Sequence, residues 1–106
     1  MHMPATPEWR TKLRRILRNT AASTIRTWCR EAGITKEKEM ALTAYAENIS
    51  VDDMAQSLGM ERRSYHEMRL CALKQLRSFL ASKPDTCRAF TAFLAANRQK
   101  DLGPMP

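Results

Sequence analysis

The stretch that decides the fold spans residues 49–68 and reads ISVDDMAQSLGMERRSYHEM. Ser50 is a preferred helix N-cap, and the acid three residues later makes the pair similar to a capping box with a shorter side chain. Gly59 provides the left-handed backbone conformation that commonly ends a helix. The spacing predicts a short helix over Val51–Leu58, a turn of three or four residues, and a longer helix from about Arg62 to Ala81.

Three further helices are predicted before this stretch. The first begins at Thr6-Pro7, because Thr can cap and Pro is favoured at the first helical position. The second runs from about Ala21 to Ala32 and ends at Gly33. The third follows the cap Thr35 to about Glu47, where Asn48 is suited to a left-handed turn. Apolar residues at helical spacing mark the inner faces, which comprise Trp9, Leu13, Ile16, Leu17, Ile25, Trp28, Cys29, Ala32, Leu42, Tyr45, Ala46, Ile49, Tyr65, Met68, Ala72, Leu76 and Phe79.

A last helix is predicted over residues 84–98, opened by Pro84 and followed by a frayed tail from residue 101. Its cluster of Phe90, Phe93 and Leu94 either closes the core or forms a dimer seam. The fold class is therefore all-α, a bundle of five or six helices. The chain is interpreted as one domain, in which residues 6–32 form a basic helical pair and residues 35–81 contain the central helices.

Composition narrows the functional classes. With 106 residues the chain is long enough for one modest core, and its charged and apolar fractions are ordinary for a globular protein. We expect a cytoplasmic protein without membrane association, because neither a membrane-length apolar run nor a signal peptide is evident. Three cysteines without metal-ligand spacing are expected to be reduced and mostly buried, with a zinc site or a redox role as the alternative.

The net charge of +7 is unevenly distributed along the chain. Residues 1–32 carry seven Lys or Arg against two acids, residues 33–61 carry two against six, and residues 62–106 carry nine against three. Positive charge concentrated on particular elements is typical of a protein with an anionic partner. The seven basic residues of the first two helices extend a phosphate-binding surface, bind an acidic protein, or form an ordinary solvated face.

A short helix, a turn containing Gly and a longer helix constitute the helix-turn-helix arrangement. Ala55 is a small residue where the two helices approach closely, and Leu58 and Tyr65 are placed to pack across the turn. Gly59 meets the backbone demand of the turn. The second helix of such a unit presents its N-terminal residues outward, where they can enter the major groove of DNA.

Residues 50–77, SVDDMAQSLGMERRSYHEMRLCALKQLR, resemble the DNA-binding region four of bacterial sigma factors and the related LuxR-type regulators. The preceding TKEKEMALTAYAEN fits the supporting helix of that fold, so the likeness spans about Thr35–Arg77. Glu61 stands where the family usually has a capping Ser or Thr. The shared pattern comprises Ser50, Asp53-Met54-Ala55, Leu58-Gly59, Ser64-Tyr65 and Ala72-Leu73-Lys74-Gln75-Leu76-Arg77, with Met54 in place of the usual Ile and Tyr65 in place of Val.

The resemblance implies a recognition helix beginning near Arg62. Arg62 and Arg63 are expected to contact guanine edges or phosphates, His66 a base or the backbone, and Glu67 the amino group of cytosine. Leu70 shares their outward face. The contacts expected with phosphate are those of Lys74, Arg77, Ser50 and Gln56.

Two functions are therefore predicted, and no catalytic residue, metal ligand or cofactor is. The first is a sequence-specific transcriptional regulator that binds double-stranded DNA, in monomeric or homodimeric form. Its size favours a stand-alone small regulator of the kind that phages and other mobile elements encode. The second is an interaction module that docks on RNA polymerase or another regulator, through the acidic segment Glu37–Asp53 or the basic N-terminal helices.

Overall fold

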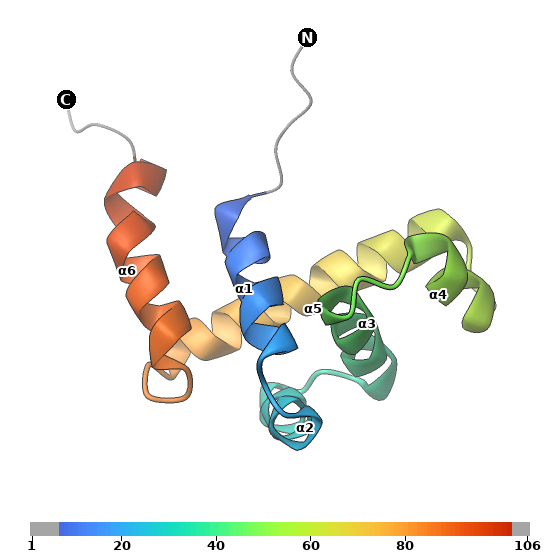
Figure 1. Ribbon diagram of the computed structural model, residues 1–106, viewed down its shortest axis with the longest axis horizontal. Helices are drawn as coiled ribbons and strands as arrows, with labels where there is room; N and C mark the ends of the chain where they lie inside the picture. The colour runs from blue at the N-terminus through green and yellow to red at the C-terminus, as the bar shows by residue number, and fades with distance from the viewer. Residues whose placement is uncertain (1–6, 103–106) are drawn as a thin grey trace, which may run out of the picture.

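The computed structural model describes residues 7–102, with side chains up to residue 97, and every regular element in that range is a helix. The prediction of an all-α bundle of five or six helices is confirmed. The six helices, seen in Figure 1, are α1 (Glu8–Arg18), α2 (Ala22–Ala32), α3 (Lys36–Ala46), α4 (Val51–Ser57), α5 (Arg62–Ser82) and α6 (Arg88–Leu102).

The longest helix, α5, organises the others (Figure 1). The short helix α4 lies at its N-terminal end and α6 at its C-terminal end, while α3 and α2 pack against it between them. Helix α1 packs on α3 and α6. Figure 1 shows α1 in front of the middle of α5, and the Arg77 guanidinium of α5 lies 4.8 Å from the ring centroid of Trp9 on α1.

Three successive helices, α2, α3 and α4, end in the same way. A left-handed residue stands at the C-cap or just after it, at Gly33 (φ 73°), Asn48 (φ 62°) and Gly59 (φ 64°). In each case the next residue donates its amide back to a carbonyl near the helix end, as when Met60 donates to Ala55 at 2.8 Å. These are Schellman motifs, which satisfy carbonyl groups that the helix leaves without partners. The sequence prediction of all three left-handed positions is confirmed.

The N-terminal ends of the helices are less uniform than these C-terminal ends. Thr35 accepts a hydrogen bond from the amide of Lys38 at 3.3 Å, and Ser50 accepts one from Asp53 at 3.1 Å, so both predicted caps are present. Helix α1 begins at Glu8 with Pro7 as its N-cap, one position later than predicted; Thr6 lies outside the described residues.

The position of the last helix was predicted wrongly at both ends. Pro84 lies in a turn, and α6 begins at Arg88 and continues to Leu102. The fixed φ of proline suits the second position of a β-turn as well as the first turn of a helix. Here the Thr86 amide donates to the Lys83 carbonyl at 2.9 Å, which closes a turn around Pro84.

The main core unites five helices. Phe90 is fully buried in it, and Phe93 and Leu94 pack against it while staying partly exposed, so the cluster contributes to the core of this chain. Most predicted inner-face residues are buried or packed against a core; the exception is Ile49, which lies after the C-cap of α3 and is 39% exposed. The buried members are Leu13, Leu17, Ile25, Trp28, Cys29, Ile34, Leu42, Ala46, Ala72, Leu73, Leu76, Phe79, Leu80 and Phe90.

All three cysteines are free, but they are not mostly buried as predicted. Cys29 is buried, Cys87 is half-buried and Cys71 is exposed on the outer face of α5. Burial raises the pKa of the Cys29 thiol to about 11, with a smaller contribution from Glu39. A thiol so placed stays protonated at neutral pH and is a packing group of the core.

Candidate nucleic-acid interface

A second, smaller core holds the helix-turn-helix unit together. Ala41 of α3, Ala55 of α4 and Tyr65 of α5 are buried against one another. Ala55 is 4% exposed, so its position has no room for a larger side chain pointing between the helices. The predicted packing of Leu58 and Tyr65 across the turn is present, and the partly buried members around this core are Val51, Met54, Leu58, Met60 and Met68.

The turn between α4 and α5 consists of residues 58–61. A Cβ added to Gly59 would meet nothing within 4 Å, so glycine is required there by the positive φ and not by lack of space. Glu61 is the N-cap of α5 and makes no side-chain capping bond. Its extended backbone (φ −67°, ψ 147°) resembles that of Ser50 and Thr35, which do cap.

The first two turns of α5 bring together four of the predicted contact residues. Arg62, Arg63, His66 and Glu67 are exposed, and with Val51 they line one hollow in the surface. Arg62 Nε lies 2.9 Å from Asp52 of α4, and Arg63 Nε lies 3.4 Å from Glu67. These ion pairs are solvent-exposed, with 74% of the Arg62 side chain accessible, so each stabilises by about 1 kcal/mol or less.

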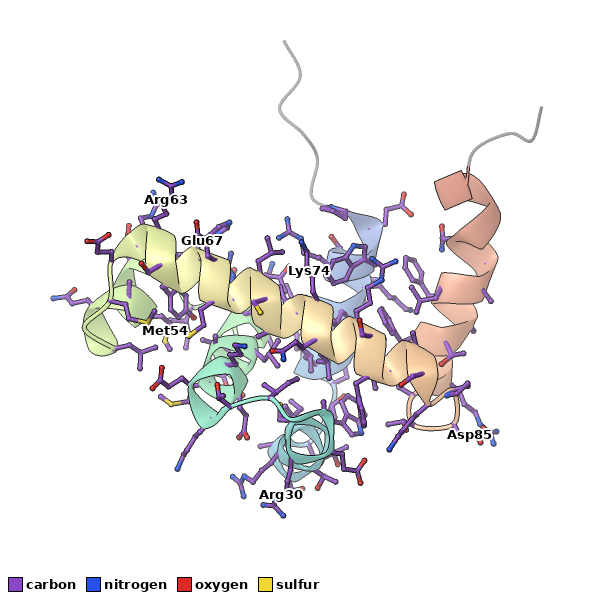
Figure 2. The ribbon with its side chains drawn as sticks, turned by 180° about the vertical axis from the view of Figure 1, so that it is seen from behind. Arg30, Met54, Arg63, Glu67, Lys74 and Asp85 are labelled. Atoms are coloured by element: carbon purple, nitrogen blue, oxygen red, sulfur yellow. The ribbon has the colours of Figure 1, made fainter. Side chains whose placement is uncertain are left out.

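The other predicted contacts are farther along the unit. Figure 2 shows Lys74 beyond Arg63 and Glu67 on α5; Lys74 is exposed and Leu70 is half-buried. Ser50 and Gln56 are exposed on and before α4, where the Ser50 oxygen accepts the capping bond and leaves its O–H free to donate. Arg77 is half-buried against Trp9, so it is shared between α5 and α1.

Sequence reasoning missed a group of arginines beside this face. Arg69 of α5 lies over the Tyr45 ring at 5.0 Å from its centroid, and Arg14 of α1 lies at 5.3 Å from the same centroid. Arg14 Nε also donates to the Tyr45 carbonyl oxygen at 3.1 Å. The charge at residue 69 was visible in the sequence, but it lies between predicted inner-face positions. Its neighbours on α1 depend on how the helices cross, which no local pattern encodes.

Helix α1 thus binds the C-terminal end of α3 through its arginines. Arg18 Nε donates to the Ala46 carbonyl oxygen at 3.4 Å, next to the bond that Arg14 makes to Tyr45. Cations near the last carbonyls of a helix are favoured by the helix dipole. Part of the basic charge of the N-terminal helices therefore has a structural role.

The described residues contain no group of side chains that could hold a metal ion. None of the helices in the same range has the length and apolar character of a membrane span. No family model, curated protein or solved structure matches the chain. Support for a function therefore comes from the geometry of the α4–turn–α5 unit and from the residues it exposes.

Proposed function

We propose that the chain is a sequence-specific DNA-binding transcriptional regulator that inserts the first turns of α5 into the major groove. The observation that carries the proposal is the α4–turn–α5 unit. It has its own small core and a left-handed turn at Gly59, and α5 begins in solvent with Arg62, Arg63 and His66. A major groove about 12 Å wide admits such a helix, and arginine forks recognise guanine edges.

The ion pairs of Arg62 and Arg63 are compatible with this role. Because both pairs are exposed and weak, DNA can replace the carboxylates at small cost. Glu67, once released, is placed to accept from a cytosine amino group. Asp52 and Glu61 remain near the approaching phosphates and repel them. Binding to a sequence without the correct base contacts is therefore disfavoured.

The test is selection of bound duplexes from a random pool at low salt. The wild-type chain is expected to enrich one preferred site. The double variant Arg62→Ala/Arg63→Ala should bind that site less tightly by about 1–3 kcal/mol for each base that it no longer recognises, and should relax its sequence preference. Arg30→Ala/Arg88→Ala, which removes two exposed arginines outside the unit, is the matched control and should retain the preference.

A pool that yields no preferred site with the wild-type chain contradicts the proposal. It is also contradicted if the Arg62/Arg63 variant and the control select the same site with the same affinity.

A second candidate function has one observation in its favour. Met40 and Ile49 are large apolar side chains that remain exposed, and both lie in the acidic segment Glu37–Asp53. An apolar contact surrounded by carboxylates suits a protein partner such as RNA polymerase or another regulator better than it suits DNA. This alternative is favoured if the wild-type chain captures polymerase from a host extract and binds no DNA. The double variant Met40→Ser/Ile49→Ser should then lose the captured polymerase.

A further inference from the structure

Arg14 of α1 and Arg69 of α5 meet over the ring of Tyr45, and Arg10 of α1 is close enough to Arg69 to repel its charge, so the three arginines form a cluster. Each of the three side chains is half-buried. Among the described residues, no carboxylate lies within 4.0 Å of any of them, whereas Arg26, Arg62 and Arg63 each have one. Like the half-buried Arg77, these three arginines are partly withdrawn from water without a carboxylate partner in the described part of the chain.

The polar groups of this cluster are incompletely satisfied. The buried Nε of Arg10 finds no acceptor among the described residues. Burial lowers the pKa of Arg69; the hydroxyls of Tyr65 and Tyr45 raise it, and repulsion from Arg10 and Arg14 lowers it further. A buried donor without a partner and desolvated like charges both cost free energy that a bound anion relieves.

The cluster is also held in place before any ligand arrives. Arg14 is fixed by its bond to the Tyr45 carbonyl, and Arg14 and Arg69 both stack on the Tyr45 ring. Arg10 is one helical turn before Arg14 on α1, so the two lie on the same face. Preorganised guanidinium forks match the oxygen atoms of a phosphate, and little side-chain entropy is lost on binding.

The position of the cluster on α5 indicates which phosphate it meets. Arg69 follows Arg62 by seven residues, which places it on the same face about 10 Å farther along the helix. Between them lies His66, whose Nδ1 is 3.5 Å from Arg69 Nη2. A helix that begins in a groove about 12 Å wide brings such a position to the backbone at the edge of the groove.

Charge at the start of α5 leads to the same conclusion. Asp52 and Glu67 pair with Arg62 and Arg63, and Glu61 directly precedes them, so carboxylates outnumber the two arginines there. Nonspecific attraction to DNA comes from neutralised phosphates, and this region supplies little of it. The cluster places three cations, without carboxylate partners in the described part of the chain, on the flank of the same helix.

We propose that Arg10, Arg14 and Arg69 bind a backbone phosphate of the DNA beside the groove that α5 enters. This inference rests on the proposed function and deepens it. It makes α1 a part of the interface that sets the docking angle of α5, while the bases are read by residues nearer the start of that helix.

The experiment measures the affinity of the full chain for duplex DNA between about 50 and 200 mM salt. The variants are Arg10→Gln and Arg69→Gln. The control is Arg30→Gln, which removes the same charge from α2, away from the helix-turn-helix unit (Figure 2). Each cluster variant should bind less tightly at low salt and lower the slope of log K against log salt by about one, while the selected sequence is unchanged. The control should keep the wild-type slope, and Arg69→Lys should largely restore it.

Circular dichroism of each variant checks that it folds; if Arg69→Gln does not, Arg10→Gln decides the test by itself. Equal slopes for wild type, Arg10→Gln and Arg30→Gln overturn the phosphate contact and leave the proposed function standing. A wild-type chain that binds no duplex overturns both. Inorganic phosphate could instead raise the melting temperature of the wild-type chain but not of Arg10→Gln, while the salt slopes on DNA stay equal. That result assigns the cluster to a free anion and overturns the DNA contact.

Discussion

At the scale of single residues, the arginines of this chain divide by their surroundings. Arg62 and Arg63 are exposed and paired with carboxylates, whereas Arg69 is half-buried and stacked on Tyr45. An exposed pair breaks at small cost, so in the proposed complex with DNA these arginines can exchange their carboxylates for bases. A guanidinium stacked on an aromatic ring is more constrained, which suits the proposed contact with a backbone phosphate.

Gly59 offers a test at this scale. Gly59→Ala should lower the free energy of unfolding by about 1–2 kcal/mol, because alanine must adopt a left-handed backbone that its Cβ disfavours. Gly59→Asn should cost less, since Asn48 already adopts a similar conformation (φ 62°) at the end of α3. Urea denaturation of the two variants measures the difference. Equal losses of stability would show that space, and not backbone conformation, selects glycine here.

At the scale of elements, α5 begins without a side-chain cap, although α3 and α4 each have one. Glutamate is too long to accept the amide two or three residues later in the way that Ser50 does. The resembled family places Ser or Thr at this position. The absence of a cap leaves the first amides of α5 available to a phosphate, while the Glu61 carboxylate opposes one.

Replacing Glu61 separates these two effects. Glu61→Ser should raise the free energy of unfolding by roughly 0.5–1 kcal/mol, because serine supplies the missing cap. Glu61→Gln removes the charge without adding a good cap, so it serves as the matched control. Both variants should bind duplex DNA more tightly at low salt, as measured by titration. If neither affinity changes, the start of α5 does not face phosphate.

At the scale of the whole molecule, the two cores have different tasks. The small core formed by Ala41, Ala55 and Tyr65 positions α4 against α5. The main core joins α1, α2, α3, α5 and α6, and it holds the N-terminal arginines against Tyr45. Because the main core contains residues of both α1 and α5, it sets where the arginine cluster lies relative to the start of α5.

Substitution of Phe90 tests whether α6 contributes to the main core. Its side chain is fully buried, with 0% accessibility, and its ring stacks with that of Phe93 at 6.3 Å between centroids. Phe90→Ala should lower the free energy of unfolding by about 3–5 kcal/mol through the cavity it leaves. Phe93→Ala, at a half-buried position, should cost clearly less. Denaturant unfolding followed by circular dichroism compares them; equal losses of stability contradict the assignment of Phe90 to the core.

Much of this architecture was predictable because it depends on local chemistry. The caps Thr35 and Ser50 and the left-handed positions at Gly33, Asn48 and Gly59 act over three to six residues. Where two local structures suit the same residue, prediction failed. Pro84 is compatible with a turn and with a helix start, and the structure has it in a turn closed by the bond from Thr86 to the Lys83 carbonyl.

The sequence by itself determined the all-helical class, where most of the helices end, and the α4–turn–α5 unit with its outward arginines. Helical periodicity and capping are properties of neighbouring residues, so they can be read without the fold. Only the tertiary structure decided which cations are paired, and that Arg10 and Arg14 meet Arg69 beside Tyr45. The physical reason is that charge pairing follows from the crossing of distant helices. That crossing is set by side-chain packing in the main core, which brings residues 10 and 69 together across the chain.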